Sequence, residues 1–287
     1  MKKILLCLDS DPQPSVFDSV VAIDADVDYL LRHGDVKPAE VRDLVHGVMF
    51  TRGGAHLKNA AVFIGGTDVH AGEQLLAAAQ KAFFGPVRVS LMLDCNGANT
   101  TAAAAVVSAR RHVPMGPETT AVVLGATGSV GQRVVRMLAQ ESVEVRVASR
   151  RLPRAEGVCH RVSQAVSGAR LTPHSTDATE VAELIQGAQL VIATGAAGVQ
   201  LLDANSRRAA ASLQVAIDLN AVPPLGVEGI EPGDKAAERA GQICYGALGV
   251  GGLKMKIHKG AINRLFQAND LVLDADEIYA LGKHLDA

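Results

Sequence analysis

The sequence predicts an α/β protein made of two α/β domains, one of them a Rossmann-type parallel sheet. Three observations lead to this prediction. Short apolar segments of strand length alternate with segments whose apolar residues recur at helical spacing. A glycine-rich turn follows one of these strands, at residues 125–131. Only 3% of the 287 residues are aromatic, so the core must be built from Ala, Val, Leu and Ile, as is typical of parallel sheets covered by helices.

The first third of the chain contains strand and helix segments without a glycine fingerprint. Short apolar runs predict strands at residues 4–8, 60–64 and 87–93. Helical spacing or a capping residue predicts helices after Ser15, over Val41–Val48, from Asp68 to about Phe84, and in the alanine-rich segment after Thr101. Because ligands bind at the carboxyl ends of strands in open parallel sheets, the small, polar loops that follow these strands are candidate binding loops.

A linker is expected at residues 114–117, which read Pro-Met-Gly-Pro, because the residue before a proline resists the helical conformation. The last helix, at 274–284, is expected to pack back on the first domain. The predicted domains are therefore residues 1–112 together with 253–287, and residues 117–252.

The glycine-rich turn has the context that a dinucleotide-binding turn requires. Residues 120–131 read T-A-V-V-L-G-A-T-G-S-V-G, and apolar residues at helical spacing follow. Gly125 permits a sharp exit from the strand, Gly128 lets the backbone approach a pyrophosphate, and Gly131 lets the helix pack close to the sheet. The phosphates would bind the N–H groups at the positive end of that helix. The predicted cofactor-binding residues of the turn are Gly125, Ala126, Thr127, Gly128, Ser129, Val130 and Gly131.

The next strand, at residues 143–148, indicates which dinucleotide binds. It ends in Ser149-Arg150-Arg151, with Arg154 close behind. An NAD site usually carries an acidic residue here for the ribose hydroxyls, and this chain has none. Guanidinium groups bind phosphate in two-point contacts, so these residues favour NADP with its 2′-phosphate. The alternative is that the arginines only solubilise the start of a helix.

Two later strands are expected to complete the dinucleotide domain. They cover residues 190–194 and 215–219, and the residues at their ends, Thr194, Gly195, Ala196 and Asn220, are expected to line the nicotinamide ribose. The glycine-rich run 246–252 is then expected to lead into a helix that opens near Leu253 and runs toward Phe266.

Composition limits the other function classes. The net charge of −2 gives no support for nucleic acid or an anionic membrane as a partner. The cysteines form no C-x-x-C pair and the nine histidines show no ligand spacing, so we expect reduced, unreactive thiols and no metal, rather than disulfides or a metal site. The N-terminal apolar run is too short for a signal peptide, and no run could cross a bilayer. A soluble, cytoplasmic protein is expected.

Several segments outside the glycine turn carry a resemblance to a known family. They are residues 9–18, 51–54, 83–86, 93–102, 220–226 and 246–258. Together they resemble the NADP-dependent methylene-tetrahydromethanopterin dehydrogenases of methylotrophic bacteria, from the first strand to the last helix. The resemblance implies oxidation of the methylene bridge of a pterin-bound one-carbon unit to methenyl, with hydride passing to NADP, and in some members use of methylene-tetrahydrofolate. It also implies an active site in the cleft between the two domains, and a homo-oligomer.

The reaction fits the residues in these segments. Loss of hydride from a carbon between two nitrogens leaves an amidinium-like cation, so the reaction needs positioning rather than a general base. Asp18 is the first candidate for a carboxylate near the developing charge or for anchoring the pterin, and Lys256 is the first candidate for polar contact with substrate. The predicted substrate-binding residues are Ser15, Phe17, Asn96, Thr100, Thr101, Lys254 and His258.

Alternative explanations exist for each of these residues and for the function. Asp18 could be only a first-turn helix acid, Asn96 a turn residue, and His258 a partner within its own helix. Tyr279 and Lys283 match the Y-x-x-x-K pair of short-chain dehydrogenases but lie outside the dinucleotide unit. A different two-domain NADP dehydrogenase and a non-catalytic NADP-binding redox sensor are the competing functions. The polar segment Arg170–Asp177 yields no prediction.

Overall fold

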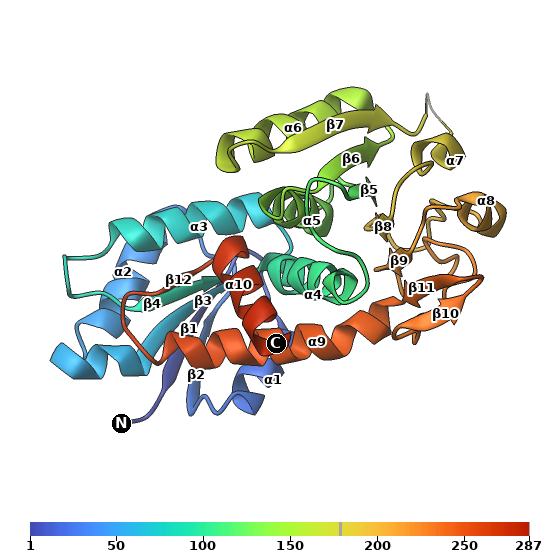
Figure 1. The fold of residues 1–287 in the computed structure, drawn as a ribbon. Coiled ribbons are helices and arrows are strands. Elements are labelled where there is room, and N and C mark those ends of the chain that lie inside the picture. The colour runs from blue at the N-terminus through green and yellow to red at the C-terminus, as the bar shows by residue number, and fades with distance from the viewer. Residues whose placement is uncertain (178–179, 287) are drawn as a thin grey trace. The chain divides into compact units, whose positions relative to one another are not determined.

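The computed structural model describes residues 1–177 and 180–286. They divide into two units, Met1–Thr100 with Met255–Ala287, and Thr101–Lys254. Figure 1 shows a sheet with flanking helices in each unit. This division places most of helix α4 (Ala98–Arg110) in the second unit, whereas the sequence prediction grouped it with the first. The predicted fold class, α/β with two parallel-sheet domains, is confirmed.

The first unit contains a five-stranded sheet in the order β12-β4-β3-β1-β2, and every neighbouring pair is parallel. Its strands are β1 (Ile4–Asp9), β2 (Tyr29–His33), β3 (Ala60–Gly65), β4 (Ser90–Leu93) and β12 (Val272–Leu273). β1 and β3 are almost entirely buried, as expected of central strands in a parallel sheet. The chain reverses its direction of strand addition between β1 and β3, so the ligand-binding crevice of such a sheet lies beside the carboxyl ends of these two strands.

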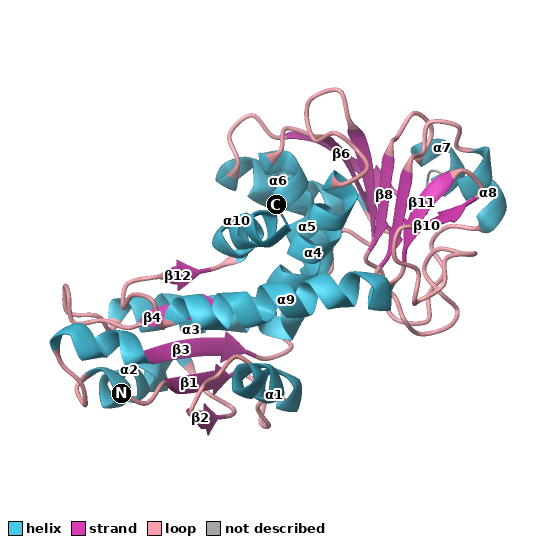
Figure 2. Cartoon of the chain, turned by 60° about the horizontal axis from the view of Figure 1, so that its bottom comes forward, coloured by secondary structure: helices cyan, strands magenta, loops and turns pink. Residues whose placement is uncertain are grey.

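Two of the predicted helices of the first unit begin directly after their predicted caps, Ser15 and Asp68, whereas the one predicted over Val41–Val48 begins earlier, at Pro38. The helices of this unit include α1 (Val16–Asp24), α2 (Pro38–Met49), α3 (Val69–Lys81) and α10 (Ala275–Asp286), with short 3₁₀ turns at η1 (Gly54–Asn59) and η2 (Cys95–Gly97). The Ser15 hydroxyl caps α1, and the Asp68 carboxylate caps α3. α2 and α3 pack together and cover one face of the sheet, where Val41, Val45 and Val48 enter the core (Figure 2).

The second unit contains a seven-stranded sheet in the order β10-β11-β9-β8-β5-β6-β7. Its strands are β5 (Thr120–Leu124), β6 (Glu144–Ser149), β7 (Arg170–Ser175), β8 (Leu190–Ala193), β9 (Val215–Asp218), β10 (Ala237–Arg239) and β11 (Gln242–Tyr245). All pairs are parallel except β10 with β11. From β7 to β11 this is the Rossmann order, whose switch point lies between β5 and β8.

Helices cover both faces of the second sheet. They are α4, α5 (Ser129–Gln140), α6 (Leu152–Ala165), α7 (Val181–Leu184), α8 (Ala204–Ala209) and the first part of α9 (Ala247–Leu265). α5 and α6 pack together, and a separate apolar cluster joins the sheet to the segments around α7 and α8. Within the described ranges, no helix is both long and apolar enough to cross a membrane.

Some element predictions are wrong, and the main one concerns α9. The helix begins at Ala247 and includes most of the glycine run that was expected to precede it. A Cβ on Gly246 or Gly249 would lie 2.0 Å or less from backbone oxygens of Glu231 and Asp234. These glycines therefore let the first turn of the helix pack against another backbone segment rather than form a loop. The fourth strand of the chain begins at Ser90 rather than at residue 87, since residues 84–87 form a tight turn.

Candidate active site

The glycine-rich turn lies at the switch point of the second sheet. Gly125 directly follows β5 and has a positive φ of 72°, which glycine adopts without strain. α5 starts directly after Gly128, and no side chain among the described residues caps its first turn. Its N-terminal N–H groups are therefore available for the phosphates of a dinucleotide.

The three glycines of the turn have different surroundings. A Cβ on Gly125 would lie 2.8 Å from the backbone of Gly195, and one on Gly131 would lie 2.8 Å from the Cα atom of Ala126. A Cβ on Gly128 would have its nearest neighbours at 3.7 Å. Gly125 and Gly131 thus hold the strands and helix close together, while Gly128 leaves open space over the turn. Such a cradle has the space and the backbone geometry that a pyrophosphate needs.

The basic residues after β6 lie at the start of α6. Ser149 is buried, while Arg150, Arg151 and Arg154 are exposed. Arg151 is the N-cap residue of α6. The first turn of this helix, all of which the structure describes, contains no acidic side chain. Cations at a helix N-terminus oppose the helix dipole. A bound anion such as a 2′-phosphate would relieve this repulsion.

The remaining predicted cofactor residues include two whose side chains hold the backbone. The Thr194 hydroxyl donates to the carbonyls of Leu124 and Gly125, at 3.0 and 3.1 Å. The Asn220 amide donates to the carbonyls of Val222 and Pro224, at 3.0 and 3.1 Å. Gly195 approaches Gly125 through its backbone, and Ala196 is exposed. Thr194 and Asn220 therefore shape the strand ends, and their contact with the cofactor stays a prediction.

The first unit has a small pocket at its own switch point. It lies between the carboxyl ends of β1 and β3 and the start of α1. Its lining residues are Cys7, Leu8, Asp9, Pro14, Ser15, Asp18, Ser19, Phe63 and Gly65. Ser10 follows β1 at the same place, and its hydroxyl oxygen is buried without a hydrogen-bond partner among the described residues. The topology of the sheet and the pocket thus point to the same ligand-binding place.

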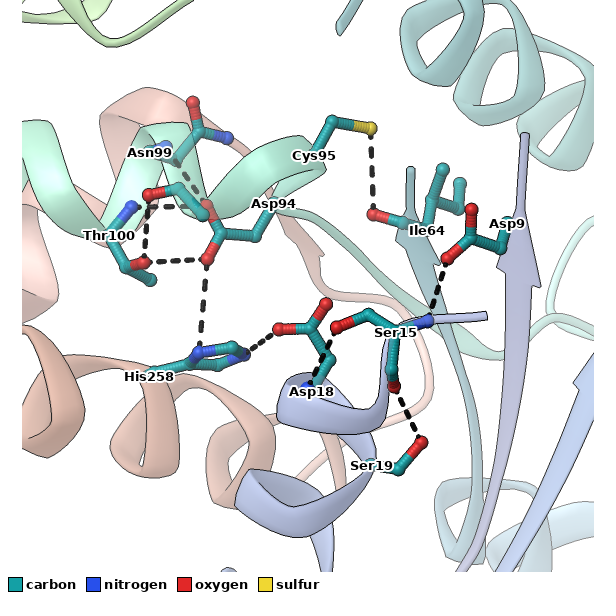
Figure 3. Close-up of polar contacts among 11 residues, drawn as sticks. Asp9, Ser15, Asp18, Ser19, Ile64, Asp94, Cys95, Asn99, Thr100 and His258 are labelled. Carbon is teal, nitrogen blue, oxygen red and sulfur yellow. Dashed lines mark hydrogen bonds and ion pairs between the residues drawn. The ribbon is translucent and has the colours of Figure 1, made fainter. Parts of the chain in front are cut away.

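Asp18, which lines this pocket, faces His258, as Figure 3 shows. Nε2 of His258 lies 3.9 Å from Oδ1 of Asp18, and Nδ1 lies 4.0 Å from Oδ2 of Asp94. His258 and Asp94 are fully buried, whereas the Asp18 side chain is 16% exposed. The Phe63 ring stacks on His258 with centroids 5.8 Å apart. Of these residues, Asp18 and Phe63 line the pocket.

Burial controls the charge of two residues in the pocket. It raises the pKa of Asp9, although backbone N–H groups of Asp11 and Ser15 partly oppose the shift by donating to the carboxylate. Burial also raises the pKa of the Cys7 thiol to about 12, and the charge of Asp18 adds to the shift. Cys7 is therefore protonated at neutral pH and is not a nucleophile.

The other predicted substrate residues are dispersed. The Nζ atom of Lys256 donates to the carbonyl of Leu285 on α10, so the structure does not bring it to Asp18. Asn96 is exposed in a left-handed turn at a φ of 53°. Thr100 is buried, and its hydroxyl donates to Asp94 at 2.6 Å. Thr101 and Lys254 are half-buried in the second unit.

Of two further predicted residues, one lines the pocket and the other lies near His258, while the Tyr279 and Lys283 pair lies on α10. Ser15 lines the pocket and caps α1, and the half-exposed Phe17 ring lies 6.4 Å from His258. Tyr279 is buried, and the Lys283 ammonium lies 4.7 Å from the centre of its ring. This pair serves as helix packing on α10.

Sequence reasoning missed Asp9, Phe63 and Asp94 as site residues. Asp94 lies within one of the segments that resemble the family, but its role depends on a contact with His258, far away in the chain. The position of Asp9 directly after a buried strand was an available signal.

Comparison with known protein families finds one matching domain in each of the two units. Residues 16–96 match the N-terminal domain of methylene-tetrahydromethanopterin dehydrogenase. Residues 121–216 match the NADP-binding domain of saccharopine dehydrogenase. The predicted cofactor, NADP, is thereby confirmed.

Two relatives from Methylorubrum extorquens and one solved structure resemble the whole chain. The bifunctional protein MdtA is 42% identical over 99% of both chains. An NAD(P)-dependent methylenetetrahydromethanopterin dehydrogenase is 27% identical over 93% of both chains. Quinate dehydrogenase from Corynebacterium glutamicum, solved with NAD, shares the fold at 13% identity, with 98% of each chain covered and a TM-score of 0.52. The chain therefore belongs to the methylene-tetrahydromethanopterin dehydrogenase family of NAD(P)-dependent oxidoreductases.

Proposed function

We propose that this protein oxidises 5,10-methylene-tetrahydromethanopterin, methylene-tetrahydrofolate, or both, to the methenyl form by direct hydride transfer to NADP in one-carbon metabolism. The observation that carries the proposal is the Asp18 carboxylate, which opens on a pocket at the switch point of the first sheet. A pterin-binding unit formed by the two ends of the chain and an NADP-binding unit in the middle are part of the same proposal.

The chemistry requires little from the protein beyond placement and charge. NADP, when bound, accepts the hydride at its nicotinamide ring. The Asp18 carboxylate stabilises the positive charge that develops on the N–C–N group, or anchors the pterin ring. The pocket itself holds only about 10 Å³, so the side chains at its mouth, with Ser15 and Phe63, would position the donor carbon. Lys256 is less favoured as a substrate contact, because its ammonium group is held by Leu285.

The second unit supplies the cofactor site in this proposal. Residues 125–131 bind the pyrophosphate through backbone N–H groups, and Ser149 with the nearby arginines binds the 2′-phosphate. Thr194 and Asn220 support the strand ends on which these groups depend. Assembly as a homo-oligomer and a cytoplasmic location stay predictions from the sequence.

The test is the initial rate of NADPH formation, followed by absorbance. Methylene-tetrahydromethanopterin and methylene-tetrahydrofolate are each assayed with NADP and with NAD. We expect turnover with NADP on at least one pterin, and the ratio of the two rates identifies the physiological carrier. A protein that binds NADP but turns over neither pterin would refute the proposal and favour the redox sensor.

A further inference from the structure

Asp94 is a buried carboxylate held in one orientation by the start of α4. Its Oδ1 atom accepts the backbone N–H groups of Asn99 and Thr100, at 2.9 and 3.1 Å. Its Oδ2 atom accepts the Thr100 hydroxyl at 2.6 Å. The Asn99 side chain ties the same segment to the Leu93 carbonyl at 2.6 Å. Three donors of this kind fix the Asp94 carboxyl group in one orientation inside the first unit.

His258 links this fixed group to Asp18. Its two ring nitrogens face the two carboxylates from opposite sides, at 4.0 and 3.9 Å (Figure 3). The ring is fully buried and stacks on Phe63 at an interplanar angle of 21°. A residue without exposed surface does not reach a substrate, so its effect on the reaction must pass through Asp18.

We propose that His258 and Asp94 are positioning residues for the reaction, and that the imidazole, oriented by Asp94, sets both the side-chain direction and the local charge of Asp18. The proposal rests on the proposed function, because it takes Asp18 to be the carboxylate that lies near a developing cation. A carboxylate displaced by about 1 Å from its productive position can cost about 100-fold in rate. The buried pair removes this freedom from the half-buried Asp18.

Several charged groups on the elements near Asp18 make contacts of their own. On α1, Asp24 is engaged with Lys259 of α9 at 2.9 Å near the surface. On β1, Asp9 is held by two backbone N–H groups, and Cys7 is a protonated thiol. On α9, the ammonium of Lys256 is held by Leu285.

The first experiment is independent of turnover. Histidine side-chain ¹⁵N spectra of the folded protein are recorded, and the His258 signals are assigned by their loss in H258Q. We expect D18N and D94N each to shift the His258 signals, and D24N, a matched change on the same helix, to leave them in place. His258 signals that are unmoved by both D18N and D94N overturn the proposal, whatever the pterin assays show.

The second experiment separates positioning from structural support. D94N and H258Q are compared with D24N in melting temperature, NADP affinity and steady-state kinetics. We expect kcat to fall by about 10- to 100-fold in D94N, with the NADP dissociation constant unchanged. If H258Q does not fold, the comparison uses D94N alone, because asparagine keeps the size of aspartate and one of its two acceptor oxygens. A folded D94N with wild-type kcat overturns the proposal. If the wild-type protein shows no turnover, the proposed function is refuted instead. The histidine spectra then decide whether His258 is coupled to Asp18 and Asp94.

Discussion

The hydroxyl group of Ser175 donates a hydrogen bond to the backbone carbonyl of Arg150 at 2.9 Å. One residue further on, the N–H of Thr176 donates to the carbonyl of Ser149 at 2.9 Å. The end of the edge strand β7 therefore fixes the backbone of the basic loop after β6. This contact shows a structural role for the segment Arg170–Asp177, for which the sequence offered no interpretation.

Loss of this support should weaken binding of NADP but not of NAD. In S175A the Arg150 carbonyl loses one hydrogen bond, whose net worth is about 1 kcal/mol, so we expect an NADP affinity about fivefold lower. NAD lacks the 2′-phosphate and should bind as before. Calorimetric titration of both cofactors measures the ratio. An equal loss for NAD and NADP would mean that Ser175 supports the sheet generally rather than the basic loop.

Removing the positive charges themselves should have a larger effect. The double variant R150A/R151A loses two of the arginines expected to contact the 2′-phosphate, and hydrogen bonds to charged groups are each worth about 1.5–3 kcal/mol. We expect NADP affinity to fall at least about tenfold, with NAD binding unchanged. R208A is the control, because the hydrogen bonds that Arg208 makes to described residues stay within α8, at Ala204 and Asn205. Unchanged NADP affinity would favour the solvation role for these arginines.

Two glycines of the turn should respond differently to alanine. In G131A the new Cβ would lie 2.6 Å from the Thr194 hydroxyl and 2.8 Å from Ala126, so α5 must move away from the sheet. We expect a lower melting temperature. In G128A the Cβ meets nothing closer than 3.7 Å, so stability should hold while NADP affinity falls, because the methyl group occupies the pyrophosphate position. The two effects are measured by thermal unfolding and titration, and a stable G128A with full NADP affinity would contradict the cradle.

The predictable part of the fold is the part whose signals are local. The helix containing Val41, Val45 and Val48 and the cap at Asp68 were both found from short-range patterns. Edge strands were missed because solvent allows them to be polar. β2 (Tyr29–His33) is largely exposed, and β7 contains a proline that only an edge strand tolerates.

The missed parts of the site depend on contacts between distant segments. The glycines at the start of α9 resembled a loop in the sequence. Glycine is needed there because the backbone of another segment, at Asp234, lies too close to leave room for a Cβ atom. Asp18 and the cofactor glycines could be proposed from the sequence, since each lies in a recognisable segment. The pairing of Asp18 with His258, and of His258 with Asp94, joins three separate elements and leaves no periodic signal.

The Cys7 thiol should be protected in the folded protein. Burial raises its pKa from 9.0 to about 12, so the folded thiol stays protonated while the unfolded chain ionises, and this group lowers stability as pH rises from about 9 toward 12. At pH 8 we expect iodoacetamide to modify Cys159, which is half-buried, well before Cys7. Mass spectrometry of labelled peptides gives the order, with urea-unfolded protein as the reference. Labelling of Cys7 at the rate of Cys159 would show that the pocket opens readily.

Replacement of Asp18 tests the core of the proposed chemistry. D18N keeps the shape of the side chain but removes the charge facing the pocket, and loss of one preorganised electrostatic group typically costs about 10²- to 10³-fold in kcat. We expect such a loss with NADP affinity unchanged, since the cofactor cradle lies on other strands. D24N, on the same helix but paired with Lys259 at the surface, should keep full activity. If D18N retained wild-type kcat and only raised KM, the carboxylate would anchor the pterin ring rather than stabilise the cation, because uniform binding changes KM alone.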